Sequence, residues 1–358
     1  MNESKTNRTL WVDVAKFMAI IAVLIDHTIG TLYVNGYVEF ISFFSVSLFI
    51  LVMGITTMWS YSKNSNDLYK KVLNKISKIL KPYAVATVIY FVFSCRYFDF
   101  EAILNNLTHF NGSSPFYYVL LYIQLVIVSP LLFYVFKKSR DIKWGFVIEI
   151  FAFLVVLLIA SLTTNYSYIL GVYGGGGKLF GGTYLILLYL GMWFGKYYDK
   201  ITINPILAGI LSLVMCGCAI GCWLFISTDM FRFDAKLPFG GGLNPPGVSL
   251  ILYAIIVAAA IYFLEIFLKK FPNGIPLKIM EKLAFVGKHT LYIFLYHRFF
   301  LDIILPGLSN KTGISFENMW IKRVVYFAFM IGGSLLIEFV LGKLHKIVLD
   351  AYKNKEKV

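Results

Sequence analysis

Long apolar stretches separated by short polar segments follow one another along almost the whole chain. Ten of them reach or approach the roughly 20 residues that a helix needs to cross a bilayer. We therefore expect an all-α polytopic membrane protein with about ten transmembrane helices, residues 1–345 forming one transmembrane domain and residues 346–358 a short basic cytoplasmic tail. The predicted spans are approximately 10–33, 38–60, 79–98, 116–136, 144–163, 183–198, 203–226, 247–268, 284–305 and 321–343.

The composition supports this class. Hydrophobic residues make up 59% of the 358 residues and charged residues only 15%, whereas soluble domains carry about 25% charged residues. The mean hydropathy is +0.74. These values exclude an ordinary soluble domain, and the polar residues that remain inside the spans become the informative ones.

The formal net charge of +14 follows from where the basic residues lie. Most of the 33 Lys and Arg residues fall in alternate connections, including 63–81, 137–143 and 269–288. Because cytoplasmic loops of membrane proteins are enriched in Lys and Arg, this alternation predicts that both termini are cytoplasmic. It also accounts for the charge without a nucleic-acid partner. The lysine-rich composition leads us to expect a bacterial plasma membrane.

The first predicted span carries ionisable residues in an otherwise apolar run: Asp13, Lys16, Asp26 and His27. A charge at the bilayer centre costs roughly 2.5–3.5 kcal/mol on insertion scales, so such residues usually face a protein interior. Lys16 and His27 are eleven positions apart, about three helical turns, and therefore share one helix face, with Asp13 close to the same stripe. This face is expected to line a polar site.

The predicted outward segments 99–115, 171–182 and 228–247 combine glycine clusters with aromatic and polar residues. Glycine lets a backbone approach a ligand closely, and aromatic rings beside polar groups suit the binding of a carbohydrate. The alternative interpretation is that these segments are flexible loops without a binding role. Candidate acceptor contacts are Asp229, Arg232, Asp234 and, within a span, Gln124. The four cysteines, Cys95, Cys216, Cys218 and Cys222, lie in or beside spans without an accompanying His, so we expect packing roles and no metal site.

Several segments together resemble the acyltransferase family 3 membrane proteins. The resemblance spans nearly the whole chain in the family's order, although each segment alone is a weak signal. The family usually has Arg-x-x-Arg where this chain has Lys75 and Lys78. The matching segments are Lys16 with His27, an aromatic-rich approach to Gly54, a basic stretch leading into Pro82-Tyr83, residues 116–132, and Val286–His297.

The resemblance implies transfer of an acyl group, usually acetyl, from cytoplasmic acetyl-CoA to an extracytoplasmic glycan such as a capsule, an exopolysaccharide or a lipid-linked precursor. It makes His27 the candidate base or acyl carrier, because imidazole titrates near neutral pH. His297 is a second candidate, for catalysis or for holding substrate. Lys16 is expected to neutralise a donor phosphate or to pair with Asp13. No permanently bound cofactor is expected.

The donor phosphates require cations, and the resemblance assigns these to Lys71, Lys75, Lys78 and Lys81. Attraction of any lysine-rich cytoplasmic segment to anionic lipid is the competing explanation. Many relatives carry an additional extracytoplasmic domain that completes transfer. We therefore expect either direct transfer by this domain, with a homo-oligomer left open, or the help of a separate partner protein.

A transporter or exporter of a glycan or its lipid-linked precursor is the alternative function. Buried charges and glycine-interrupted segments also suit transport. The spacing of Lys16 and His27, together with the lysines before Pro82, favours the enzyme, because an exporter has no need for a CoA site.

Overall fold

The computed structural model describes residues 9–34, 36–95, 97–172, 174–227, 242–312 and 318–355. Throughout these ranges the secondary structure consists of α-helices with short 3₁₀ and π segments, and no β-strand is formed. The prediction of an all-α polytopic membrane protein is therefore confirmed.

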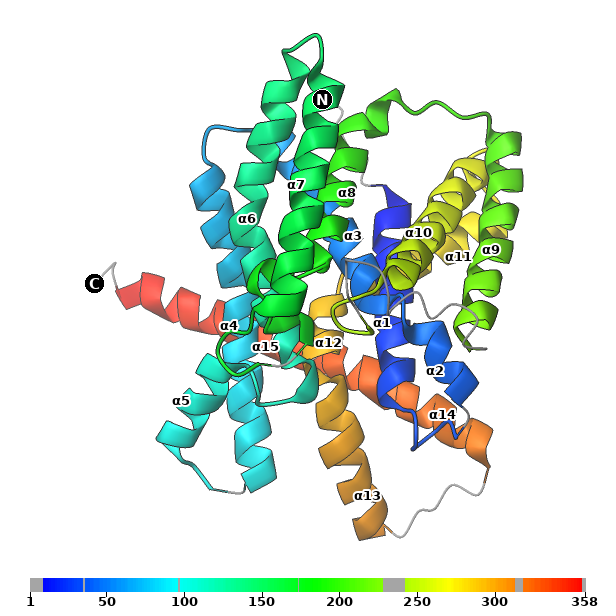
Figure 1. The fold of residues 1–358 in the computed structure, drawn as a ribbon. Helices are drawn as coiled ribbons and strands as arrows, with labels where there is room; N and C mark the ends of the chain where they lie inside the picture. Colours follow the sequence, from blue (N-terminus) through cyan, green and yellow to red (C-terminus); the bar gives the residue numbers. More distant parts are fainter. Residues whose placement is uncertain are drawn as a thin grey trace.

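The described helices form a bundle of long, roughly upright elements with shorter helices at the two ends (Figure 1). The chain is continuously helical across the predicted domain boundary at residue 345. The helices are α1 (Leu10–His27), α2 (Gly36–Ser42), α3 (Ser45–Lys63), α4 (Leu68–Cys95), α5 (Phe100–His109), α6 (Tyr117–Arg140), α7 (Gly145–Tyr166), α8 (Tyr184–Tyr197), α9 (Pro205–Ser227), α10 (Val248–Leu268), α11 (Ile275–Gly287), α12 (Thr290–Phe299), α13 (Leu305–Thr312), α14 (Met319–Ala328) and α15 (Ser334–Lys355).

Eight helical segments of the described chain are long and apolar enough to cross a membrane. The remaining two predicted spans are present as α1 and α8. α1 has 18 residues but carries Asp13, Lys16 and Asp26, and α8 has only 14 residues. Both lie in the middle of the bundle, where protein rather than lipid surrounds them, so neither needs the length or the apolarity of a lipid-facing span.

Several helix boundaries differ from the predicted ones, and three of these differences affect the site. α1 ends at His27, because the chain then turns with Gly30 at φ +82°. α4 begins at Leu68, so the predicted basic loop is the first half of a long helix. The predicted span 284–305 is divided at Lys288 and His289: α11 ends there at Gly287, which packs so closely on the backbone of α1 at Asp13 that a Cβ would collide with it.

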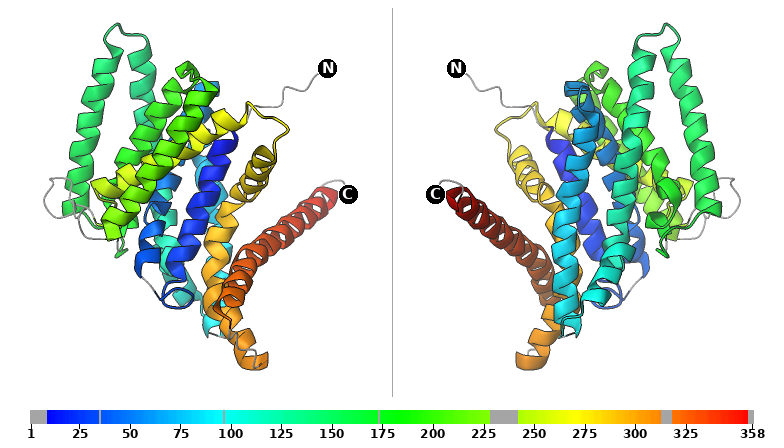
Figure 2. Two further views of the ribbon diagram at one scale, coloured as in Figure 1. Left: turned by 90° about the vertical axis from the view of Figure 1, so that its right-hand side faces the viewer. Right: turned by 90° about the vertical axis from the view of Figure 1, so that its left-hand side faces the viewer.

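The connections of the bundle fall into two groups (Figure 1). The α3–α4, α6–α7 and α8–α9 connections lie at one end, and the α1–α2 and α4–α5 connections at the other. The first end contains the basic segments 63–81 and 137–143, so the charge alternation seen in the sequence is reproduced in space. α15 leans away from the bundle (Figure 2). Few residues of α9 and of the α14–α15 segment are buried, which leaves their apolar side chains facing outward.

Another close helix crossing is that of α3 with α8, at Gly54 and Gly191. A Cβ at Gly191 would collide with the carbonyl oxygen of Leu51, and a Cβ at Gly54 would lie 2.5 Å from the carbonyl oxygen of Leu188. Small residues at such a crossing let two helix backbones approach without lost packing. This crossing brings α3, which lines the site described below, against the buried α8.

We predict that Gly191→Val destabilises the protein, because the added side chain forces α3 and α8 apart. Overpacking of this kind costs about 1–3 kcal/mol. The thermal unfolding midpoint of the detergent-solubilised protein measures the effect. Gly217→Val in α9 is the matched control, since nothing lies within 4 Å of a Cβ at that position. Equal midpoints for the two variants would contradict the close crossing.

Candidate active site

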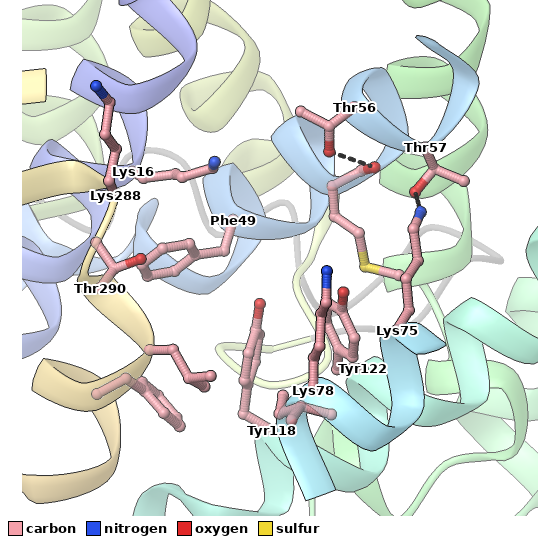
Figure 3. Close-up of a pocket in the computed structure, with 14 residues that line it drawn as sticks. Lys16, Phe49, Thr56, Thr57, Lys75, Lys78, Tyr118, Tyr122, Lys288 and Thr290 are labelled. Atoms are coloured by element: carbon pink, nitrogen blue, oxygen red, sulfur yellow. Dashed lines mark hydrogen bonds between the residues drawn. The ribbon is translucent and has the colours of Figure 1, made fainter. Parts of the chain in front are cut away.

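A cavity of about 320 Å³ lies between α1, α3, α4, α6 and the start of α12, and lysines are its distinguishing feature (Figure 3). Lys16 comes from α1, Lys75 and Lys78 from α4, and Lys288 from the α11–α12 connection. In Figure 3, Lys16 and Lys78 extend into the space between the helices. We call this the inner cavity. The other lining residues are Phe49, Met53, Thr56, Thr57, Ile79, Tyr118, Tyr122, Thr290, Leu291 and Phe294.

Two of the lysines that line the inner cavity, Lys16 and Lys75, have a defined hydrogen-bond or ion-pair partner. Lys16 Nζ lies 3.2 Å from Oδ1 of the buried Asp13, one helical turn earlier. Lys75 Nζ donates a hydrogen bond to Thr57 Oγ1 at 2.7 Å and lies 5.0 Å from the ring centroid of Tyr61. Four lysines and no acidic side chain are among the lining residues, so the inner cavity has an excess of positive charge that suits a polyanionic ligand.

The structure brings only two of the four lysines predicted for donor binding into this cavity. Lys75 and Lys78 line it, as their i,i+3 spacing on α4 allows. Lys71 instead donates to the backbone carbonyls of Ser60 and Asn64 and so ties α4 to the end of α3. Lys81 is exposed and does not line the inner cavity.

A second cavity, of about 280 Å³, lies at the opposite end of α1, and we call it the outer cavity. Its polar lining includes Asp26 and His27 of α1. Ser42 Oγ at the end of α2 donates to Asp26 Oδ1 at 3.2 Å. The rings of Tyr117 and Tyr184 provide flat apolar surface beside these polar groups. Val23, Phe43, Ser45, Val46, Ser114, Pro115, Leu243, Asn244 and Phe294 complete the lining.

The two histidines predicted as catalytic candidates lie side by side, although 270 positions separate them in the chain. The rings of His27 and His297 have centroids 5.0 Å apart and planes at 33°. His297 is completely buried. Its Nδ1 lies 2.8 Å from the carbonyl oxygen of Phe294 and 3.1 Å from that of Ile293. We therefore assign the Nδ1 proton to these hydrogen bonds, which leaves Nε2 as the acceptor of the neutral ring.

The glycine-rich segment 171–182 forms two short 3₁₀ turns, Gly174–Gly176 and Leu179–Gly181, against α6. Gln124 holds it there: Nε2 donates to the carbonyl oxygen of Gly176 at 2.9 Å, and Oε1 accepts from the amide of Phe180 at 2.8 Å. Gln124 therefore supports this segment and lines neither cavity. Asn244 Oδ1 accepts from the amide of Gly175 at 2.8 Å, which joins the segment to the wall of the outer cavity.

The other acceptor candidates, Asp229, Arg232 and Asp234, lie outside the described residues. The four cysteines lie within the described residues. In the ranges that the structure covers, no group of three or more His, Cys, Asp or Glu side chains is arranged to hold a metal ion. Cys216 and Cys218 are exposed on α9.

A family model described as an acyltransferase domain matches residues 9–340, nearly the whole chain. The chain belongs to acyltransferase family 3. It is accordingly a membrane acyltransferase, and this assignment gives no support to the transporter alternative. No curated protein and no solved structure shows a significant match.

Three further acids of this acyltransferase, of which Glu149 and Glu265 are buried, are bound by residues outside the linings of the inner and outer cavities. Glu149 binds Lys196, Ser139, Trp193 and Tyr197, and these contacts join α7 to α6 and α8. Glu265 accepts from the first amides of α1. Glu338 lies 3.0 Å from His289 Nδ1 and so connects α15 to the α11–α12 connection. The last contact lies next to Lys288, which lines the inner cavity.

Among the lining residues that sequence reasoning missed, Lys288 and Asn244 carry polar groups into the two cavities. Lys288 appeared only as one more basic residue of a cytoplasmic segment, yet it lines the inner cavity with Lys16. Asn244 carries no distinguishing pattern apart from its place in a glycine- and proline-rich run. Lys288 lies in Val286–His297, one of the segments that resemble the family, and this resemblance was the signal that could have pointed to it.

We predict that Gln124→Met loosens the glycine-rich segment, because the amide of Phe180 and the carbonyl of Gly176 lose their partner. Leaving a buried polar group unpaired costs about 1–3 kcal/mol. Hydrogen exchange at the Phe180 amide should accelerate and the thermal midpoint should fall. Asn165→Ala is the control, since that exposed side chain bonds only within its own helix. Unchanged exchange at Phe180 would contradict the supporting role.

Proposed function

We propose that this acyltransferase transfers an acetyl group from cytoplasmic acetyl-CoA to hydroxyls of an extracytoplasmic polysaccharide or lipid-linked glycan, in a bacterial plasma membrane. The observation that carries the proposal is the placement of α1 between two cavities. Lys16 lines the inner cavity and His27 lines the outer one. One helix thus presents an anion-binding group and a proton acceptor to two separate spaces.

The inner cavity fits the donor. Acetyl-CoA carries its charge on phosphates, and lysine binds phosphate as a point charge. Four lysine ammonium groups line this cavity, and Lys16 is paired with the buried Asp13 behind the lining. Phe49, Tyr118 and Tyr122 continue the lining as aromatic surface, which suits the less polar arm that bears the thioester.

The outer cavity fits a sugar acceptor. The tyrosine rings of Tyr117 and Tyr184 offer flat surface to the apolar face of a sugar ring. Asp26, Ser114 and Asn244 offer hydrogen-bonding groups to hydroxyls. Surface of both kinds in one cavity is typical of sites that orient a ligand by a few polar contacts.

In the proposed reaction, His27 acts where the acetyl-CoA donor from the inner cavity meets the glycan acceptor in the outer cavity. The acceptor hydroxyl oxygen attacks the thioester carbonyl carbon while His27 takes the hydroxyl proton as general base. The new carbon–oxygen bond forms the ester, the carbon–sulfur bond breaks, and the CoA thiolate leaves and takes up the proton. His297, buried against His27 and fixed through Nδ1, positions the His27 ring.

We predict that His27→Ala abolishes acetylation of the surface glycan but leaves the amount of glycan unchanged. Loss of a general base lowers the rate by roughly 10²–10⁴-fold. A strain lacking the gene is complemented with wild type or variant, and the acetyl methyl signals of the isolated glycan are measured by proton NMR. His109→Ala is the control, because His109 bonds to Asn105 within the exposed α5. If the variant strain makes normally acetylated glycan that no longer reaches the surface, the result would contradict the proposed acetyl transfer and favour a role in glycan export.

We predict that replacing Lys75 and Lys78 weakens donor binding more than turnover. Loss of a hydrogen bond to a charged group costs about 1.5–3 kcal/mol, so the KM for acetyl-CoA should rise roughly tenfold or more for Lys78→Ala, with a smaller change in kcat. Inverted membrane vesicles from the host expose the cytoplasmic face and contain the endogenous acceptor. Lys282→Ala is the control, an exposed lysine of α11 outside the inner cavity. An unchanged KM would argue against a donor site here.

A further inference from the structure

The inner and outer cavities share one lining residue, Phe294 of α12. Every other described residue that lines one of them is missing from the lining of the other. The Phe294 side chain is only 5% exposed. The ring of Phe294 therefore borders both the space that contains the lysines and the space that contains His27.

Aromatic rings fix Phe294 from both sides. Its ring centroid lies 4.9 Å from that of Tyr118, which lines the inner cavity, and 6.1 Å from that of His297. His297 is in turn 5.0 Å from His27. The backbone adds a further constraint, because the carbonyl oxygen of Phe294 accepts the His297 Nδ1 hydrogen bond at 2.8 Å. The rings of Tyr118, Phe294, His297 and His27 thus form a continuous series from one cavity to the other.

We infer that Phe294 determines the length of the acyl group that this enzyme transfers; the inference rests on the proposed function. The thioester carbonyl has to reach His27 from the lysine-lined side, so the alkyl part of the acyl group must occupy the space beside the Phe294 ring. A buried ring with neighbours on both sides leaves room for a methyl group. Each further methylene has to displace packed aromatic atoms, and protein interiors resist such overpacking.

The same ring contributes to the separation of the two cavities. A wide opening between them would join the cytoplasmic and extracytoplasmic spaces through the protein. A phenyl group closes this position without adding a polar group that needs a partner. Chain-length selection and closure are therefore consequences of one side chain.

The test compares acyl-CoA donors of increasing length with wild-type and variant proteins. Inverted membrane vesicles from the host receive radiolabelled acetyl-CoA, butyryl-CoA or hexanoyl-CoA, and label released from the acceptor by mild base is counted. Vesicles from the deletion strain give the background. One methylene in an apolar pocket changes kcat/KM by about 10–200-fold. We expect Phe294→Ala to raise the ratio of hexanoyl to acetyl transfer at least tenfold, and Phe294→Trp to lower the ratio of butyryl to acetyl transfer.

Phe299→Ala is the matched control. It removes an equally buried phenylalanine from the same helix, one that packs on Tyr90 and Phe93 and lines neither cavity. Its ratio of hexanoyl to acetyl transfer should remain that of wild type. Phe294→Leu keeps an apolar but smaller side chain, and it replaces Phe294→Ala if the alanine variant does not accumulate in the membrane. It should raise butyryl transfer relative to acetyl transfer.

The outcomes separate the two proposals. If wild-type vesicles transfer no label above the deletion background, the proposed function fails. If wild type transfers acetyl and the Phe294 variants keep the wild-type preference for chain length, the inference is overturned and the function stands. Folded Phe294 variants that have lost transfer of all three donors would also overturn it, because the ring would then be required for the reaction itself rather than for selection.

Discussion

The hydrogen bonds that fix the start of α1 determine where the whole site lies. Both carboxylate oxygens of Glu265 accept from backbone amides of α1, at 3.1 Å from Leu10 and 3.0 Å from Trp11. The first amides of a helix have no partner within the helix, and in an apolar environment an unpaired amide is costly. A carboxylate is also favoured at the positive end of the helix dipole. This cap, with the close packing of Gly287 on α1, sets the depth of α1 in the bundle.

The fixed depth of α1 then separates the chemistry into two halves. Lys16 and His27 are about 16 Å apart along the helix axis, at 1.5 Å per residue. This distance places one in the lysine-lined inner cavity and the other beside Asp26 in the outer cavity. A rigid helix suits the task better than loops, because its own backbone bonds keep the two groups at a constant separation.

Hydropathy was sufficient to predict the all-α polytopic class, since it depends on the bilayer rather than on tertiary detail, although eight of the ten predicted spans are long and apolar enough to cross a membrane by themselves. Helical spacing predicts that Lys16 and His27 share a face that lines one polar site, but the two residues line two different cavities. It did not predict which lysines of α4 reach the inner cavity, because Lys71 finds carbonyl partners at the end of α3. The contact of His27 with His297 and the place of Phe294 depend on how distant helices pack, and an apolar residue in an apolar run carries no local signal.

The unpartnered nitrogen of His297 is consistent with a site that exchanges ligands. Nε2 is buried and has no hydrogen-bond partner among the described residues, a condition that costs about 1–3 kcal/mol. The other ring nitrogen is fixed, so the ring cannot turn to relieve this cost without losing the bonds to α12. Buried polar groups without a hydrogen-bond partner are rare in protein interiors, and each one calls for an explanation. The His297 ring lies between those of Phe294 and His27, beside the path that the proposed reaction gives to the acyl group. The cost at His297 therefore falls where the proposed chemistry occurs, and not in the parts of the bundle that only support it.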